Sequence, residues 1–190
     1  LGAAIRALVL GAPRNLLTAV VVFAAVVSNT ASEMGYVVLV PLAAVVFHSV
    51  GRNPLVGLAA AFAGVSGGYS ANILIGTVDP LLSGITTEAA QIIDPAYALG
   101  GAKEVLPTAN YYFMFISTFL ITIVGTLVTN YIVEPKLGPY DPTRAEDGVE
   151  DAAKDMGALS LTEKRGLKLA GLTVLAMLGV LAALALPENG

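Results

Sequence analysis

Apolar runs alternate with short polar interruptions along the chain, and the lengths of these runs predict the elements. The first long apolar stretch, from Leu16 to Phe47, is divided by the polar sequence SNTASEMGY at residues 28–36. A spanning helix needs about 20 apolar residues, and the piece on each side of this interruption is shorter than that. The pattern therefore predicts a re-entrant hairpin over residues 16–50, in which two half-length helices meet at a polar tip.

The next apolar stretch contains a second interruption, SGGYSAN at residues 66–72, which is soon followed by Asp79. Glycine has no Cβ, so Gly67 and Gly68 allow the chain to leave helical geometry at little cost. Irregular backbone within a membrane is tolerated where it is buried in protein or lines a wet cavity. These residues predict a discontinuous transmembrane helix over residues 54–83.

Two more apolar runs predict two further transmembrane helices, at residues 108–134 and 169–186. The remaining segments are more polar. We expect residues 1–15 to form an interfacial or cytoplasmic segment, residues 84–107 an extracytoplasmic loop that can include a short helix, and residues 135–168 a cytoplasmic loop. The sequence thus predicts an all-α polytopic membrane protein.

The distribution of basic residues predicts which side of the membrane each loop occupies. If residues 16–50 form a hairpin, nine of the ten lysines and arginines fall on one side, and only Lys103 falls on the other. Cytoplasmic loops carry the excess of these residues, so the side with nine is expected to be cytoplasmic. Two full crossings in place of the hairpin give the same count. Segment length, not charge, therefore favours the hairpin.

Composition supports a membrane protein and argues against several classes of function. Of 190 residues, 56% are apolar and 13% are charged, with a mean hydropathy of +0.78, whereas soluble domains carry about 25% charged residues. The chain has no cysteine, and its single histidine, His48, cannot form a multi-histidine metal site. It contains no Ser/His/Asp constellation, paired catalytic carboxylates or phosphate loop, so we expect no enzyme. It also lacks the clustered basic face of a nucleic-acid-binding protein.

Both interruptions carry residues that can bind an ion or a solute. Hydroxyl and amide groups supply oxygen ligands for a hard cation and donors for an anion, and half-helix ends add partial charges. We expect the two interruptions to face each other and to share a ligand. The alternatives are small polar residues that only pack between helices and a glycine-rich kink without a ligand. The candidate residues are Ser28, Asn29 and Thr30 in the first interruption and Ser66, Gly67, Gly68 and Asn72 in the second.

Asp79 is the most demanding candidate, because an ionisable side chain within a span is costly and usually faces a cavity, a partner or a proton path. It could carry a proton, ligate a cation or reach the headgroups from the end of the span. A cluster of aromatic and amide residues could contact an aromatic solute or mark the membrane interface. Its members are Tyr69, Asn110, Tyr111 and Tyr112.

Three long phrases between Pro13 and Gly138 resemble the AbgT family of aminobenzoyl-glutamate transporters. They are SNTASEMGYVVLVPLAAVVF, VGRNPLVGLAAAFAGVSGGYSANILIGTVDPLLSGITTEAAQIIDP and NYYFMFISTFLITIVGTLVTNYIVEPKLG. The pairing of SNT with a later Gly/Ser/Asn break is also similar, more distantly, to the divalent-anion/sodium symporters. In those proteins a hairpin tip and an unwound helix jointly bind sodium and a substrate carboxylate.

The resemblance implies that residues 28–30 are hairpin-tip ligands and that Ser66, Gly67, Gly68 and Asn72 oppose them, with a possible Na⁺ at Asn29, Gly67 and Asn72. It implies one half of an inverted-repeat fold in a dimeric inner-membrane carrier, so the chain is expected to be a fragment. The implied cargo is aminobenzoyl-glutamate or a sulfonamide-like antimetabolite, driven by Na⁺ or H⁺ with no other cofactor. A channel subunit and a structural membrane subunit without its own solute are the alternatives.

Overall fold

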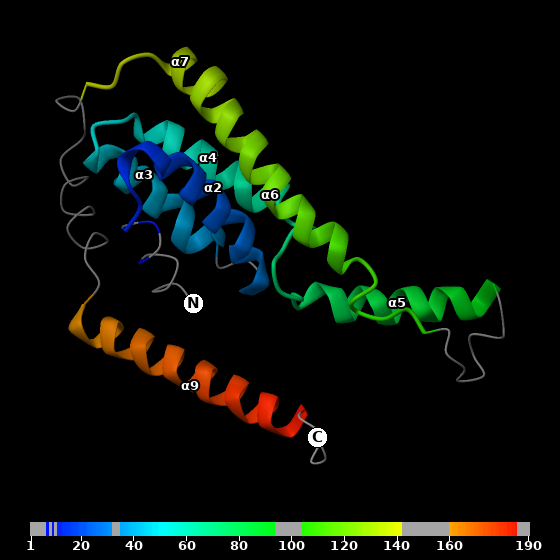
Figure 1. Cartoon of the computed structure of the whole chain (residues 1–190). Helices are drawn as coiled ribbons and strands as arrows, with labels where there is room; N and C mark the ends of the chain where they lie inside the picture. The colour runs from blue at the N-terminus through cyan, green and yellow to red at the C-terminus, as the bar shows by residue number, and fades with distance from the viewer. Residues whose placement is uncertain are drawn as a thin grey trace. The chain divides into compact units, whose positions relative to one another are not determined.

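The computed structural model describes residues 7, 9, 11–31, 35–93, 104–141 and 160–185. The chain divides into two units, Leu1–Gly157 and Ala158–Gly190. Every regular element in the described ranges is helical, as Figure 1 shows. The elements are η1 (Arg14–Leu16), α2 (Leu17–Ser28), η2 (Asn29–Ala31), the π-helix η3 (Gly35–Leu39), α3 (Val40–Ser49), α4 (Pro54–Gly67), α5 (Val78–Ile93), α6 (Tyr111–Val128), the π-helix η5 (Thr129–Val133), α7 (Glu134–Leu137) and α9 (Leu161–Ala185).

The predicted hairpin is present. Its first arm, α2, has 12 residues, and its second arm is the continuous apolar helix Gly35–Ser49. At 1.5 Å per residue each arm is about 18–22 Å long, which is shorter than the roughly 30 Å hydrocarbon core of a bilayer. Residues 32–34 of the tip lie outside the described residues. Each arm is thus shorter than a full crossing, as the predicted hairpin requires.

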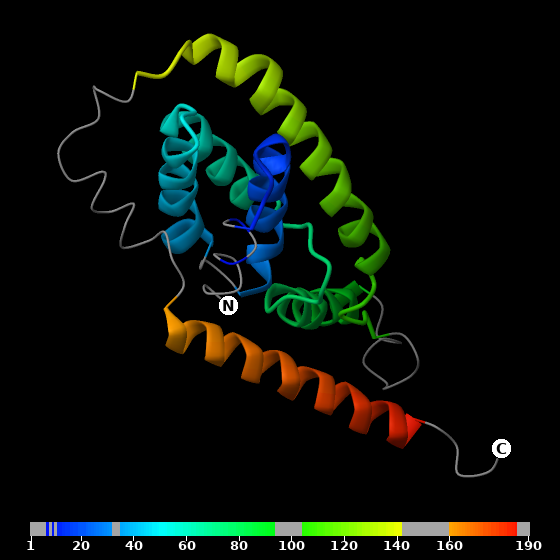
Figure 2. The ribbon, with the colours of Figure 1, turned by 60° about the vertical axis from the view of Figure 1, so that its left-hand side comes forward.

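Both arms of the hairpin pack against α4, and α6 lies along the outside against α2 and α4 (Figure 2). The buried core is made of aliphatic and small side chains from α2, α3 and α4, with Phe47 fully buried. Among the described residues, Tyr111–Leu137 is one continuous helix of 27 residues with a mean hydropathy of 1.9, long and apolar enough to cross a membrane. It contains most of the span predicted at residues 108–134.

Small residues let α4 approach both arms closely. A Cβ on Gly57 would lie 2.5 Å from the backbone oxygen of Ala43 and 2.7 Å from the Phe47 ring, and a Cβ on Gly64 would lie 2.6 Å from Ala25 Cβ. Gly35, at the start of the second arm, would place a Cβ against Ser28 Oγ. Close packing through small residues is typical of helices in membranes, and here it holds the hairpin against the broken helix.

Gly64→Ala is expected to destabilise the protein by about 1–2 kcal/mol, because its methyl group overpacks the contact with Ala25. Gly67→Ala is the matched control on the same helix, since a Cβ on Gly67 has no heavy atom within 4 Å. The measurement is the thermal unfolding midpoint of the purified protein in detergent. Equal midpoints for the two variants would show that α4 does not depend on this close approach.

Two predicted boundaries in the chain differ from the structure. The second half of the broken helix was expected to complete a crossing by residue 83, with a loop at 84–107, but α5 begins at Val78 and continues to Ile93. Asp79 and Pro80 in its first turn favour a helix start at this point. Apolar residues at helical spacing then favour its continuation past residue 83. Figure 1 shows α5 leading away from the bundle of α2, α3 and α4.

The second boundary lies in the unit Ala158–Gly190, where α9 begins at Leu161 rather than at residue 169. A capping box explains the early start. Ser160 Oγ accepts a hydrogen bond from Glu163 N at 3.1 Å, and Glu163 Oε2 accepts one from Ser160 N at 2.9 Å. This reciprocal pair satisfies two free amides at a helix start, so residues 161–168, which were predicted to be loop, are helical.

Candidate functional site

The hairpin tip and the break after α4 contact each other, as expected. Asn29 Nδ2 donates hydrogen bonds to Val26 O at 3.1 Å within its own arm and to Val65 O at 3.0 Å on α4. Thr30 Oγ1 lies 2.6 Å from Asn72 Oδ1 and 2.8 Å from Val27 O, and its single hydrogen is directed to one of these two oxygens. Residues more than 35 positions apart in the chain are thus held together by polar side chains.

The backbone fixes the orientation of the Asn72 amide. Ile73 N lies 3.0 Å from Asn72 Oδ1, and because a backbone N–H can only donate, the atom that it faces must be the amide oxygen. Asn72 is only 5% exposed. Its oxygen therefore accepts from Ile73 N and lies 2.6 Å from the Thr30 hydroxyl oxygen, and its Nδ2 is left as the donor on the other side.

A cavity of about 220 Å³ opens where the tip, the break and α5 meet. Asn29, Asn72 and Asp79 line it, and these are three of the residues predicted to form the site. The aromatic side chains of Tyr69 and Phe113 line it as well. The cavity therefore combines amide groups, one carboxylate and aromatic faces, which is the mixture of an apolar pocket with a few convergent polar groups that binds small molecules.

Asp79 lies in the first turn of α5 and is half-buried at the edge of this cavity. Its Oδ2 accepts a hydrogen bond from Gly76 N at 2.6 Å. The carboxylate is therefore held by the unwound segment that precedes α5, and the positive end of the α5 dipole favours its negative charge.

The N-terminal end of α6 also lines the cavity, and the sequence predicted only part of this contribution. Asn110, Phe113 and Met114 line the cavity, and their i, i+3, i+4 spacing places them on one helix face. That spacing was the signal available in the sequence for Phe113 and Met114. Tyr111, from the same turn, donates its hydroxyl to Ile73 O in the unwound segment at 3.1 Å.

Tyr111→Phe is expected to destabilise the protein by about 0.5–1.5 kcal/mol, because one hydrogen bond no longer holds the unwound segment. Tyr112→Phe is the matched control, since Tyr112 is 82% exposed. The measurement is the thermal unfolding midpoint of the purified protein in detergent. Equal midpoints in the two variants would show that Tyr111 does not hold the unwound segment.

The other predicted site residues lie outside the cavity. Ser28 is fully buried and donates to Ala25 O at 2.6 Å, and Gly68 packs against Val26. Ser66 and Gly67 are exposed, and Ser66 Oγ lies 3.0 Å from Tyr36 OH. Gly67, which was suggested as a sodium ligand together with Asn29 and Asn72, does not line the cavity that those two residues share.

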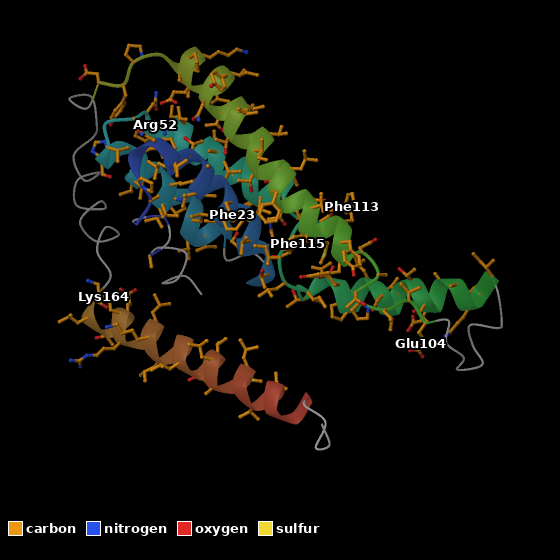
Figure 3. All side chains as sticks on the ribbon, in the orientation of Figure 1. Phe23, Arg52, Glu104, Phe113, Phe115 and Lys164 are labelled. Carbon is orange, nitrogen blue, oxygen red and sulfur yellow. The ribbon has the colours of Figure 1, made fainter. Side chains whose placement is uncertain are left out.

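A second polar cluster, which the sequence did not reveal, ties the base of the hairpin to the end of α6. Arg52 donates to Glu134 from Nε at 2.8 Å and from Nη2 at 2.6 Å, a bidentate pair. It also donates to Thr18 Oγ1 at 2.9 Å and to Asn130 Oδ1 at 3.1 Å, and its guanidinium lies 4.5 Å from the centre of the Phe47 ring. Figure 3 shows Arg52 at the opposite end of the bundle from Phe113 and Phe115.

The π-helix η5 positions two members of this cluster. A π-helix inserts one extra residue per turn and rotates the residues around it. Asn130 lies within η5, and Glu134 follows it directly at the start of α7. The two side chains therefore face Arg52 together, and the base of the hairpin is fixed while the cavity lies at its tip.

The known proteins to which this chain is similar are transporters. The p-aminobenzoyl-glutamate transport protein of Escherichia coli (strain K12) is 38% identical over 170 residues, which are 90% of this chain and 31% of that protein. The solved structure of Neisseria gonorrhoeae MtrF, described as illuminating a class of antimetabolite efflux pumps, is 50% identical with a TM-score of 0.84. The Alcanivorax borkumensis YdaH transporter is 40% identical with a TM-score of 0.81.

Both structural matches cover 100% of this chain, and they cover 36% and 37% of MtrF and YdaH. The chain therefore spans about a third of the length of its relatives. These relatives are transport proteins, not enzymes, as the sequence predicted. The model of the AbgT putative transporter family matches residues 1–190. The chain belongs to the AbgT family of membrane transporters.

Proposed function

We propose that this chain forms part of a secondary active transporter for p-aminobenzoyl-glutamate-like solutes, including sulfonamide-like antimetabolites. The cavity between the hairpin tip and the break carries the proposal, since it joins Asn29, Asn72 and Asp79 with aromatic walls. An aminobenzoyl solute has an aromatic ring and polar groups that complement such a lining. The names of the Escherichia coli and Neisseria relatives support the same class of cargo.

Transport would proceed by alternating access around this site, driven by a proton or sodium gradient. Discontinuous helices whose ends meet near the middle of the membrane are the usual setting for solute and coupling-ion sites in such carriers. Asp79 is the carboxylate among the lining residues, so it is the group through which either ion would act. We further propose a dimer in the inner membrane, with the loops rich in lysine and arginine on the cytoplasmic side.

The test is uptake of radiolabelled p-aminobenzoyl-glutamate by proteoliposomes that contain the complete transporter, with imposed pH and sodium gradients applied separately. The proposal predicts saturable flux that one of the two gradients accelerates. Flux that rises in proportion to concentration and ignores both gradients would indicate a channel, and absence of flux under every gradient would indicate a structural subunit. Either result would contradict the proposal.

A further inference from the structure

Gly76 lies beside a polar recess in the wall of the cavity. A Cβ on Gly76 would lie 3.5 Å from Asp79 Oδ2, 3.7 Å from Asn72 Nδ2 and 3.8 Å from the backbone oxygen of Asn29. These are ordinary van der Waals distances, and the φ angle of Gly76 is not in the left-handed region. Neither steric conflict nor backbone conformation therefore requires glycine here. What a side chain would do at this position is fill the recess.

The three polar atoms around the recess define the group that complements them. The carboxylate oxygen of Asp79 and the backbone oxygen of Asn29 accept hydrogen bonds, whereas Asn72 Nδ2, whose orientation Ile73 N fixes, donates. Two neighbouring acceptors complement a group that donates two N–H bonds, as a primary amine does. An alkylammonium has three donors and no acceptor, so it would leave the Asn72 donor opposed to its charge.

An arylamine meets this requirement, because delocalisation of its lone pair into the ring keeps it uncharged at neutral pH. The ring itself would meet aromatic side chains, since Tyr69 and Phe113 line the same cavity and are 64% and 68% exposed. Offset or edge-to-face contacts between such rings are favourable. Carboxylates on the far end of the solute would be directed away from Asp79 by like-charge repulsion.

We propose that Gly76 is a specificity-determining position, whose missing side chain leaves room for the primary arylamine of the cargo between Asp79, Asn72 and Asn29. This inference rests on the proposed function and adds to it the orientation of the solute, with the amino group at the junction of the hairpin tip and the break. It also explains why a residue that the backbone would allow to be alanine is glycine.

The test compares KM values for p-aminobenzoyl-glutamate and for benzoyl-glutamate, which lacks the amino group, in proteoliposomes with the complete transporter. In the unmodified protein, benzoyl-glutamate is expected to have a KM about tenfold higher, as for the loss of one or two hydrogen bonds. Gly76→Ala is expected to raise the KM for the amino compound by about tenfold and to abolish the preference. Gly84→Ala on α5, where a Cβ meets nothing within 4 Å, is the control and is expected to change neither value.

The possible results distinguish failure of the inference about Gly76 from failure of the proposed function. A Gly76→Ala protein that keeps the original KM and the original preference would overturn the inference while leaving the proposed function intact. If Gly76→Ala does not yield folded protein, the comparison of the two solutes in the unmodified transporter still decides, because equal KM values would overturn the inference. If the unmodified transporter carries neither solute, the proposed function fails and the inference falls with it.

Discussion

Asp79→Asn is expected to reduce gradient-driven solute uptake by about 10- to 100-fold, the equivalent of losing a charged hydrogen-bonding group worth about 1.5–3 kcal/mol. Asn keeps the size of the side chain and can still accept a hydrogen bond from Gly76 N, which lies 2.6 Å from Asp79 Oδ2. The substitution therefore preserves the start of α5 and removes the charge. The measurement is the initial rate of uptake with a pH gradient and with a sodium gradient.

Glu88→Gln is the matched control, because Glu88 is an exposed carboxylate on the same helix. It loses one negative charge without touching the cavity, so its uptake is expected to equal that of the unmodified protein. A pair of variants that behave alike would mean that Asp79 acts no differently from a surface charge, and its proposed role in coupling would have to be abandoned.

Arg52→Ala is expected to destabilise the protein by about 2–3 kcal/mol, somewhat less than the 3–5 kcal/mol that follows when one partner of a fully buried ion pair is removed. The expected loss of stability is smaller because water partly screens this ion pair. The side chains of Arg52 and Glu134 are 23% and 31% exposed. The variant leaves the Glu134 carboxylate without its bidentate donor and removes bonds to Thr18 and Asn130. The measurement is the unfolding midpoint in detergent.

Two further variants test whether stability depends on the hydrogen bonds of Arg52 or only on the presence of a positive charge. Lys136→Ala removes an exposed positive charge from α7 and is expected to leave the midpoint unchanged. Arg52→Lys keeps the charge but cannot form the planar bidentate pair, so it is expected to recover only part of the lost stability. Full recovery by lysine would show that the geometry of the guanidinium is unimportant.

The hairpin and the broken helix could be predicted because the length of an apolar run is a direct constraint on whether it crosses a bilayer. SNTASEMGY divides its stretch into pieces too short to span, and the structure has arms of matching length. Contact between the two interruptions was predictable for a related reason. Polar side chains and irregular backbone inside a membrane need hydrogen-bond partners. The polar groups of one interruption are suitable partners for the polar groups of the other.

Other features depend on contacts that a single sequence does not reveal. The Arg52–Glu134 pair joins residues 82 positions apart, and nothing in the spacing of either residue indicates its partner. The position of Gly67 illustrates a second limit. It shares the second interruption with Asn72, yet it is exposed whereas Asn72 lines the cavity, because the side on which each residue falls is decided by where α4 ends.

Helix boundaries in polar segments were the weakest part of the prediction. Residues 84–93 were expected to lie in a loop that could include a short helix, because the segment up to residue 107 mixes glycine, proline and charged residues. A surface helix, however, needs only one apolar stripe. α5 has no buried residues in the described structure, so the signals for it were Asp79 and Pro80 at its start and the helical spacing of its apolar residues. At α9 the Ser160 and Glu163 capping box marks the start eight residues before the apolar run begins.

A map of the complete transporter with p-aminobenzoyl-glutamate bound would examine most directly whether the hairpin tip and the break share a cargo site. We expect density for the solute in the cavity lined by Asn29, Asn72 and Asp79, with its ring against Tyr69 or Phe113. Density for the solute elsewhere, with this cavity unchanged and unoccupied at saturating concentration, would contradict the proposal that these two interruptions bind the transported molecule.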